Sequence, residues 1–103
     1  MDDNWIYVTD DGGLSEGTVV PVYPLGVNLI LARIDGQVYA LTGCCPHMGC
    51  PLFMGTLSGA ILTCQCHDWR FDLRTGHFLD APELQLKRYQ TCFEDGKIFI
   101  KIN

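Results

Sequence analysis

Apolar and polar residues alternate along most of the 103-residue chain, in short runs rich in β-branched and aromatic side chains. Alternation with a period of two is typical of strands that bury one face, and no long run has the 3.6-residue period of a helix. Strands are expected at residues 5–8, 18–23, 28–34, 37–41, 60–63, 69–72, 89–93 and 97–102. The pattern therefore predicts an all-β fold.

Two Asp-Gly pairs, Asp35-Gly36 and Asp95-Gly96, separate neighbouring predicted strands. A two-residue Asp-Gly link favours the tight turn of an antiparallel hairpin. Thr75-Gly76 marks a further turn, and a short helical turn is expected around residues 14–17. Many short strands joined in this way predict an antiparallel β-sandwich or partial barrel. The chain length predicts a single domain, residues 1–103.

Composition narrows the function classes. The net charge is −5, which argues against a nucleic-acid surface because phosphate binding needs clustered Lys and Arg. Prolines and glycines interrupt the longest uncharged run, residues 17–32, so it predicts strand and turn instead of a membrane span. The start of the chain lacks the basic and apolar regions of a secretion signal. We therefore expect a cytoplasmic protein whose acidity either aids solubility or steers it to basic partner proteins.

The six cysteines carry the candidate chemistry. Five of them lie in one segment with two of the three histidines, at positions Cys44, Cys45, His47, Cys50, Cys64, Cys66 and His67. Without a secretion signal, such a density indicates metal binding more often than a disulfide framework. Both halves of the segment follow predicted strands, where loops usually carry binding chemistry. A thiolate and an imidazole from each of two loops suit either a [2Fe–2S] cluster or a zinc ion.

The residues alone leave three ligand sets open. One zinc set is symmetric and resembles two knuckles around a tetrahedral ion: Cys44, His47, Cys64 and His67. The other zinc set leaves out the histidines: Cys45, Cys50, Cys64 and Cys66. A cluster would place two thiolates on one iron and two imidazoles on the other: Cys45, Cys64, His47 and His67.

The flanking residues resemble those of one family. Cys45-Pro-His47-Met-Gly-Cys50, followed after sixteen residues from His47 by Cys64-Gln-Cys66-His67, resembles the Rieske signature of C-x-H and C-x-x-H. Similar residues recur outside the ligands, at Gly55, Leu57, Phe71-Asp72, Thr75-Gly76 and Ala81-Pro82. The resemblance extends from about residue 5 to the end of the chain. It implies a Rieske-like β-sandwich or partial barrel, with a small cluster-binding subdomain of two ligand loops at about residues 43–82.

The resemblance also implies roles for individual residues. It assigns one [2Fe–2S] cluster to Cys45, His47, Cys64 and His67. It implies shielding of that cluster by Met48, Trp69 and Pro82. Cys50 and Cys66 match the positions of a loop-to-loop disulfide in respiratory Rieske proteins, whereas a reducing cytosol would keep two free thiols. Both states stay open at this point.

The ligands and their surroundings bear on the reduction potential. Replacing two anionic thiolates with neutral imidazoles removes negative charge, so adding an electron costs less than in an all-thiolate cluster. Respiratory Rieske proteins resembling this one add a serine and a tyrosine hydroxyl near the second loop. Trp69 and Phe71 occupy those positions here. The resemblance therefore implies a potential below that of respiratory Rieske centres.

Three functions follow as hypotheses. The first is a soluble one-electron carrier, a Rieske-type ferredoxin that passes electrons from a reductase to a terminal oxygenase and is not itself an enzyme. The second is a Rieske-like small subunit of a larger oxidoreductase such as assimilatory nitrite reductase. The third is a structural zinc-binding β domain. None of the three involves nucleic acid or a membrane.

Overall fold

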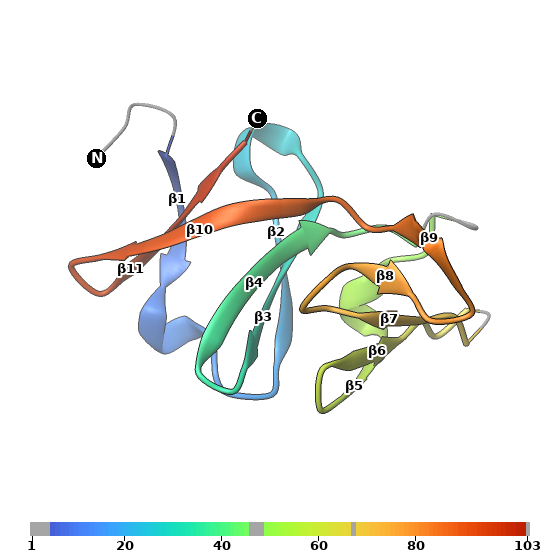
Figure 1. Cartoon of the computed structure of the whole chain (residues 1–103). Coiled ribbons are helices and arrows are strands. Elements are labelled where there is room, and N and C mark those ends of the chain that lie inside the picture. The colour runs from blue at the N-terminus through green and yellow to red at the C-terminus, as the bar shows by residue number, and fades with distance from the viewer. Residues whose placement is uncertain (1–4, 46–48, 67, 103) are drawn as a thin grey trace.

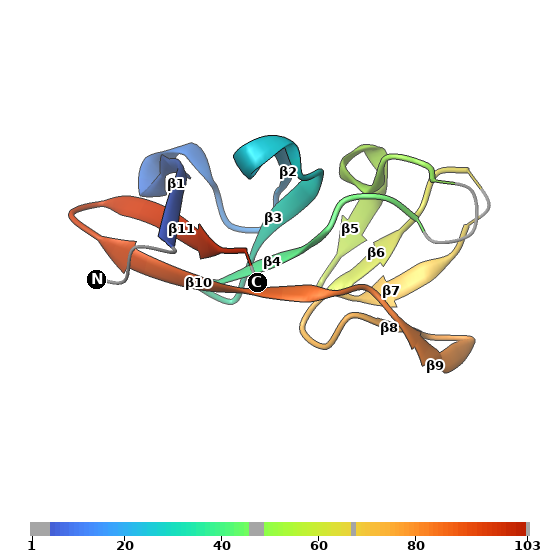
Figure 2. The ribbon, with the colours of Figure 1, turned by 90° about the horizontal axis from the view of Figure 1, so that it is seen from above.

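The computed structural model describes residues 5–45, 49–66 and 68–102. Within these ranges two antiparallel sheets lie side by side, and β10 leads from the second sheet back into the first (Figure 1, Figure 2). The first sheet, in spatial order, consists of β1 (Trp5–Asp10), β11 (Lys97–Lys101), β10 (Arg88–Glu94), β4 (Gln37–Thr42), β3 (Leu29–Ile34) and β2 (Val19–Val22). The second consists of β5 (Thr56–Ser58), β6 (Ile61–Thr63), β7 (Arg70–Asp72), β8 (His77–Phe78) and β9 (Ala81–Gln85). The all-β prediction is confirmed.

Two hairpins of the first sheet close as the sequence predicts. Ile34 pairs with Gln37 across Asp35-Gly36, and Glu94 pairs with Lys97 across Asp95-Gly96. All four turn residues have positive φ, between 52° and 78°. Both central residues of a type I′ turn need this conformation, which explains the Asp-Gly sequences.

Strand β3 is buried on both faces and separates two hydrophobic cores. Leu29 and Leu31 belong to the first core, whereas Ile30 and Ala32 belong to the second. The first core consists of Leu14, Val22, Leu29, Leu31, Val38, Ala40, Ile98 and Ile100. The second core consists of Ile30, Ala32, Ile34, Leu41, Cys45, Cys50, Leu52, Leu62, Cys64, Phe71, Leu73, Phe78 and Leu86. The second core therefore connects β3 to the smaller sheet and includes three sulfur atoms.

The structure adds elements that the alternation pattern missed. Strands β5 and β8 are three and two residues long, too short for a repeating pattern to be visible. Strand β9 contains Pro82 and is exposed at four of its five positions, so no apolar face marks it. The short helical turns are η1 (Asp11–Gly13), η2 (Pro24–Gly26) and η3 (Leu52–Met54), so the turn expected at 14–17 was placed too late.

Among the described residues, no helix has the length and apolar character needed to cross a membrane.

Candidate metal centre

Two loops at one end of the second sheet carry the sulfur atoms. The first loop, residues 45–50, follows β4 and precedes η3. The second loop, residues 64–69, connects β6 to β7, which pair directly through Thr63 and Arg70. Cys64 directly follows β6, whereas Cys45 lies three residues after β4 and next to Cys44, which forms an isolated antiparallel bridge with Pro51. Paired backbone therefore fixes the position of the first cysteine of each loop.

The two loops have the same backbone hydrogen bonds. The amide of Cys45 donates to the carbonyl of Cys50 at 2.9 Å, and the amide of Cys64 donates to the carbonyl of Trp69 at 2.7 Å. The carbonyl of each first cysteine accepts in turn from an amide four residues later, that of Gly49 at 2.8 Å or Asp68 at 3.0 Å. The described residues of the two loops therefore share one pattern of backbone hydrogen bonds.

The residue four positions after the first cysteine of each loop has a left-handed backbone. Gly49 has φ +69° and Asp68 has φ +58°. Glycine adopts this conformation without strain, whereas a residue with a Cβ does so at a cost. Aspartate is one of the few side chains found there routinely, so both sequences suit the same loop.

The first cysteine of each loop is removed from solvent. Cys45 is 2% exposed and Cys64 is 0% exposed, and both belong to the second core. Cys64 lies one residue after β6, whose Leu62 is also fully buried. Each loop thus supplies one thiol from an apolar, water-free environment.

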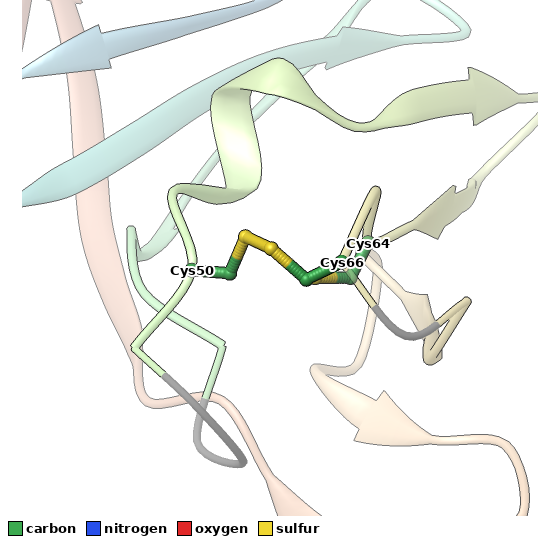
Figure 3. A group of neighbouring side chains, drawn as sticks. All are labelled: Cys50, Cys64 and Cys66. Atoms are coloured by element: carbon green, nitrogen blue, oxygen red, sulfur yellow. A yellow bond between two sulfur atoms is a disulfide. The ribbon is translucent and has the colours of Figure 1, made fainter.

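A disulfide joins the loops. Cys50, at the end of the first loop, is bonded to Cys66, in the middle of the second, with Cα atoms 6.5 Å apart. Figure 3 shows this bond between the loops, with Cys64 beside Cys66. Among the described residues, the sulfurs of Cys50, Cys64 and Cys66 all lie within 4.8 Å of one another. The bond therefore fixes the spacing of the two loops next to the buried Cys64 sulfur.

The first loop is also anchored to the first sheet. Asn28, directly before β3, accepts the amide of Gly43 at 3.0 Å through its backbone carbonyl. Its side-chain Nδ2 donates to the sulfur of Cys44 at 3.1 Å. A Cβ at Gly43 would clash with the Asn28 side-chain oxygen, so a larger residue there would displace the Asn28 side chain. Cys44 thus bonds to the scaffold, which does not support the zinc set that includes it.

Sequence reasoning missed the contact of Asn28 with this loop. A glycine directly before a Cys-Cys pair is the signal that could have indicated a close backbone approach at this point.

Aromatic rings line the second loop. Trp69 stacks on Phe78 with ring centroids 4.2 Å apart and planes 9° from parallel. The fully buried Phe71 lies 5.5 Å from Phe78, centroid to centroid. Trp69 is half-buried and packs against the second core. Its ring therefore covers the side of the loop that faces β8.

His47, Met48 and His67 lie outside the described residues, so their roles stay predictions. Pro82 is exposed in β9, and its role as a shield likewise stays a prediction. Cys50 and Cys66, open from the sequence, are disulfide-bonded in the structure.

The described donors suit an iron–sulfur cluster. Thiolate sulfur is the ligand that iron–sulfur clusters prefer. Cys45 and Cys64 offer one buried sulfur each, from matching loops. Two buried sulfurs from two loops with matching hydrogen bonds would supply half of a cluster's ligands, which favours a metal site with thiolate ligands.

Comparisons with known proteins also indicate an iron–sulfur centre. A family model described as the Rieske [2Fe-2S] domain matches residues 4–90. The ferredoxin component of the naphthalene 1,2-dioxygenase system of Pseudomonas aeruginosa is 32% identical over 104 residues, covering 100% of both chains. The ferredoxin component of the naphthalene 1,2-dioxygenase/salicylate 5-hydroxylase systems of a Ralstonia species is 31% identical, covering 99% of both.

A solved structure shares the fold over the same extent. It is a chain from a complex of reduced oxygenase and oxidised ferredoxin in carbazole 1,9a-dioxygenase, with a TM-score of 0.87 and 25% identity. The similarity covers 97% of this chain and 94% of that one. This chain belongs to the Rieske [2Fe–2S] domain family, and its cofactor is one [2Fe–2S] cluster.

Proposed function

We propose that this protein is a one-electron carrier of an oxygenase system, taking electrons from a reductase and delivering them to a terminal oxygenase. The observation that carries the proposal is similarity over the whole chain to ferredoxin components of such systems. A carrier of this kind acts in the cytoplasm, binds its partners in turn and is not an enzyme by itself.

The ligands that we assign to the cluster are Cys45, His47, Cys64 and His67. The matching hydrogen bonds of the two loops and the burial of both first cysteines support the two thiolates. The two histidines complete the Rieske pattern of one thiolate and one imidazole from each loop. We also assign residues 43–82 as the cluster-binding part of a single Rieske domain.

The surrounding residues would tune and protect the centre. When bound, a [2Fe–2S] cluster accepts and releases one electron at a time. The buried Cys45 and Cys64 hold their sulfurs away from water, which favours a less negatively charged centre. The Cys50–Cys66 disulfide and the ring of Trp69 limit the movement of the second loop. A rigid loop changes little between redox states, so electron exchange needs little rearrangement.

Matched substitutions test the ligand assignment. His47→Ala and His67→Ala should each abolish the visible absorption and the rhombic, low-average-g paramagnetic resonance signal of the reduced protein. His77→Ala is the control, because His77 lies in β8 outside the two loops. Cys45→Ser should likewise lose the cluster, whereas Cys44→Ser should keep it, since Cys44 bonds to Asn28. An unchanged spectrum in either histidine variant would refute the assignment.

Electron delivery is tested separately. Protein reduced with limiting dithionite should lose one electron per chain on mixing with an oxidised oxygenase of the naphthalene dioxygenase type. Stopped-flow absorption of the cluster would follow this transfer, with oxidised cytochrome c as a non-specific acceptor for comparison. A centre that reduces cytochrome c but not oxygenases of this type would contradict the proposed partner and leave the ligand assignment intact.

A further inference from the structure

Three cysteine sulfurs from the two loops lie close together. Cys50, Cys64 and Cys66 come from both loops, and their sulfurs all lie within 4.8 Å of one another. A tetrahedral zinc ion with Zn–S bonds of about 2.3 Å separates its sulfur ligands by about 3.8 Å. Two of these sulfurs are bonded to each other, and the third lies within 4.8 Å of both. With that bond open, rotation of the side chains can bring all three sulfurs to this separation. Water or another side chain can supply the fourth ligand.

The disulfide prevents two of the three sulfurs from binding a metal ion. A disulfide sulfur is not a thiolate, so Cys50 and Cys66 cannot bind zinc while they are bonded to each other. Cys66 is exposed, so an external reductant can reach this bond. A dithiol would reduce it by exchange: the two dithiol sulfurs form a disulfide, and both cysteines become thiols.

Reduction would leave the sulfurs close together. The backbone bonds from Cys45 to Cys50 and from Cys64 to Trp69 hold each loop without the disulfide. Cys50 and Cys64 are also packed in the second core, at 7% and 0% exposure. A zinc ion would then displace one proton from each of three thiols without a large change of the loops.

We propose that reduction of the Cys50–Cys66 disulfide creates a zinc site of Cys50, Cys64 and Cys66, and that the intact disulfide reserves Cys64 for the iron–sulfur cluster. The zinc site itself stands on the three sulfurs. The competition rests on the proposed function, which assigns Cys64 to the cluster. Zinc has no redox chemistry in proteins, so a zinc-loaded chain carries no electrons. The disulfide thereby selects which metal the two loops hold.

A zinc challenge of the cluster-loaded protein tests the proposal. The protein is incubated with zinc chloride, with and without a phosphine reductant, and the visible absorption of the cluster is followed. Zinc bound after desalting is measured by mass spectrometry. The reduced protein should lose its absorption at least about 10-fold faster and retain one zinc ion per chain, since even an outer-sphere change alters metal affinity by about 10-fold or more. Equal rates and equal zinc content with and without reductant would overturn the proposal.

Single substitutions identify the ligands. Cys66→Ser and Cys50→Ser remove one sulfur each, so reductant should no longer speed the zinc-driven loss of the cluster. Cys92→Ser is the matched control, because Cys92 lies in β10 away from the three sulfurs, and it should behave as the wild type does. Zinc uptake by reduced Cys66→Ser equal to that of the reduced wild type would refute the ligand set.

Cobalt binding to the full chain freed of iron gives a second measurement. Thiolate-to-cobalt absorption should increase when the disulfide is reduced, because two more thiolates become available, and this increase should be lost in Cys66→Ser. In competition with a chromophoric chelator, that variant should bind zinc more than about 100-fold more weakly, since losing a direct ligand exceeds the cost of losing an outer-sphere partner. Equal cobalt spectra before and after reduction would contradict the zinc site. Failure of the proposed function would instead show in protein not exposed to zinc, as missing iron or as an absent paramagnetic signal after reduction with dithionite.

Discussion

The two sheets of this protein are built on different principles. Strands of the first sheet are four to seven residues long, and its hairpins at Asp35-Gly36 and Asp95-Gly96 close in two residues. Strands of the second sheet are two to five residues long. Backbone hydrogen bonds of Cys45 and Cys64, together with a disulfide, hold the loops beside these strands. The first sheet is therefore held by its own strand pairing. The second sheet also depends on the hydrogen bonds and the disulfide of the two loops.

The comparison also shows how the two sheets depend on each other. Strand β3 contributes Leu29 and Leu31 to the first core and Ile30 to the second. Asn28, just before β3, fastens the first loop through Gly43. A destabilising substitution in the first core should therefore lower the free energy of unfolding of the whole protein. A destabilising substitution in the second core should also speed the loss of the cluster.

A matched pair of core deletions tests that difference and has the largest expected effect. Leu62→Ala, in the second core, and Ile98→Ala, in the first, each remove a side chain with 0% exposure. Each should lower the free energy of unfolding by about 2–5 kcal/mol, from lost burial and the cavity left behind. Urea titration followed by circular dichroism measures this loss.

Cluster lifetime separates the two variants. Leu62 lies two residues before Cys64, so its deletion should also speed the loss of visible absorption under an iron chelator at low urea. Ile98→Ala should keep the wild-type lifetime under conditions in which it stays folded. Equal cluster lifetimes in the two variants would show that the second core has no special role in retaining the cluster.

The reduction potential should respond to the second sheet alone. Phe71 is fully buried next to the second loop, and the resemblance to respiratory Rieske proteins implies a tyrosine at this position in them. Phe71→Tyr would add a hydroxyl that can donate to the cluster and stabilise the added electron. One such hydrogen bond of about 1 kcal/mol corresponds to a rise of about 40 mV for a one-electron couple.

Phe99→Tyr is the control for this substitution, because Phe99 lies in β11 of the first sheet. Protein-film voltammetry of both variants measures the shift. A potential that is unchanged in Phe71→Tyr, or that rises equally in both variants, would remove the role assigned to the second sheet.

The first sheet was largely predictable from local sequence. Alternation located its strands to within two residues at each end, and the Asp-Gly pairs fixed two hairpins. These signals are local because each strand has one regular pattern and each turn requires positive φ. The edge position of β2 even accommodates Pro21, which cannot donate a ladder hydrogen bond.

The second sheet was only partly predictable. The cysteine and histidine spacing indicated two ligand loops, but β5, β8 and β9 carry no periodic signal. The contact between Asn28 and Cys44 joins residues sixteen positions apart, and the local sequence around Asn28 carries no signal that predicts it. Such contacts depend on the packing of two sheets, so single-sequence patterns cannot reveal them.

The twin loops allow a finer test, because the same left-handed position is Gly49 in one and Asp68 in the other. Gly49→Ala should cost about 1 kcal/mol from backbone strain alone, since an added Cβ there meets no atom within 4 Å. Asp68→Gly should be neutral or slightly stabilising, because it removes a strained Cβ but adds freedom to the unfolded chain. Thermal unfolding measures both.

Gly12→Ala is the control for the loop substitutions. Its Cβ would also meet no atom within 4 Å, and Gly12 does not have a positive φ. It should therefore be harmless. A cost for Gly12→Ala as large as that for Gly49→Ala would mean that strain in the loop is not what the experiment measures.

The smallest effect concerns the turn after β7. Arg74 donates hydrogen bonds from its guanidinium to Asp72, at 3.2 and 3.1 Å, and these bonds lower the pKa of the Asp72 carboxyl below its usual 3.8. A carboxyl whose pKa is lowered by folding stabilises the folded state above its unfolded pKa, and this contribution is lost as the pH falls through the folded pKa. Solvent screens the pair, so the contribution is small.

Asp72→Asn isolates this charge, because an asparagine oxygen can still accept the Arg74 amide that Asp72 accepts at 2.9 Å. The wild type should be slightly more stable than the variant at pH 7, and the difference should vanish at a pH well below 3.8, where Asp72 is neutral in both states. Urea midpoints at the two pH values measure it. Because the turn closes the β7–β8 hairpin of the second sheet, a difference that persists at low pH would mean that hydrogen-bond geometry, and not charge, holds this part of the sheet together.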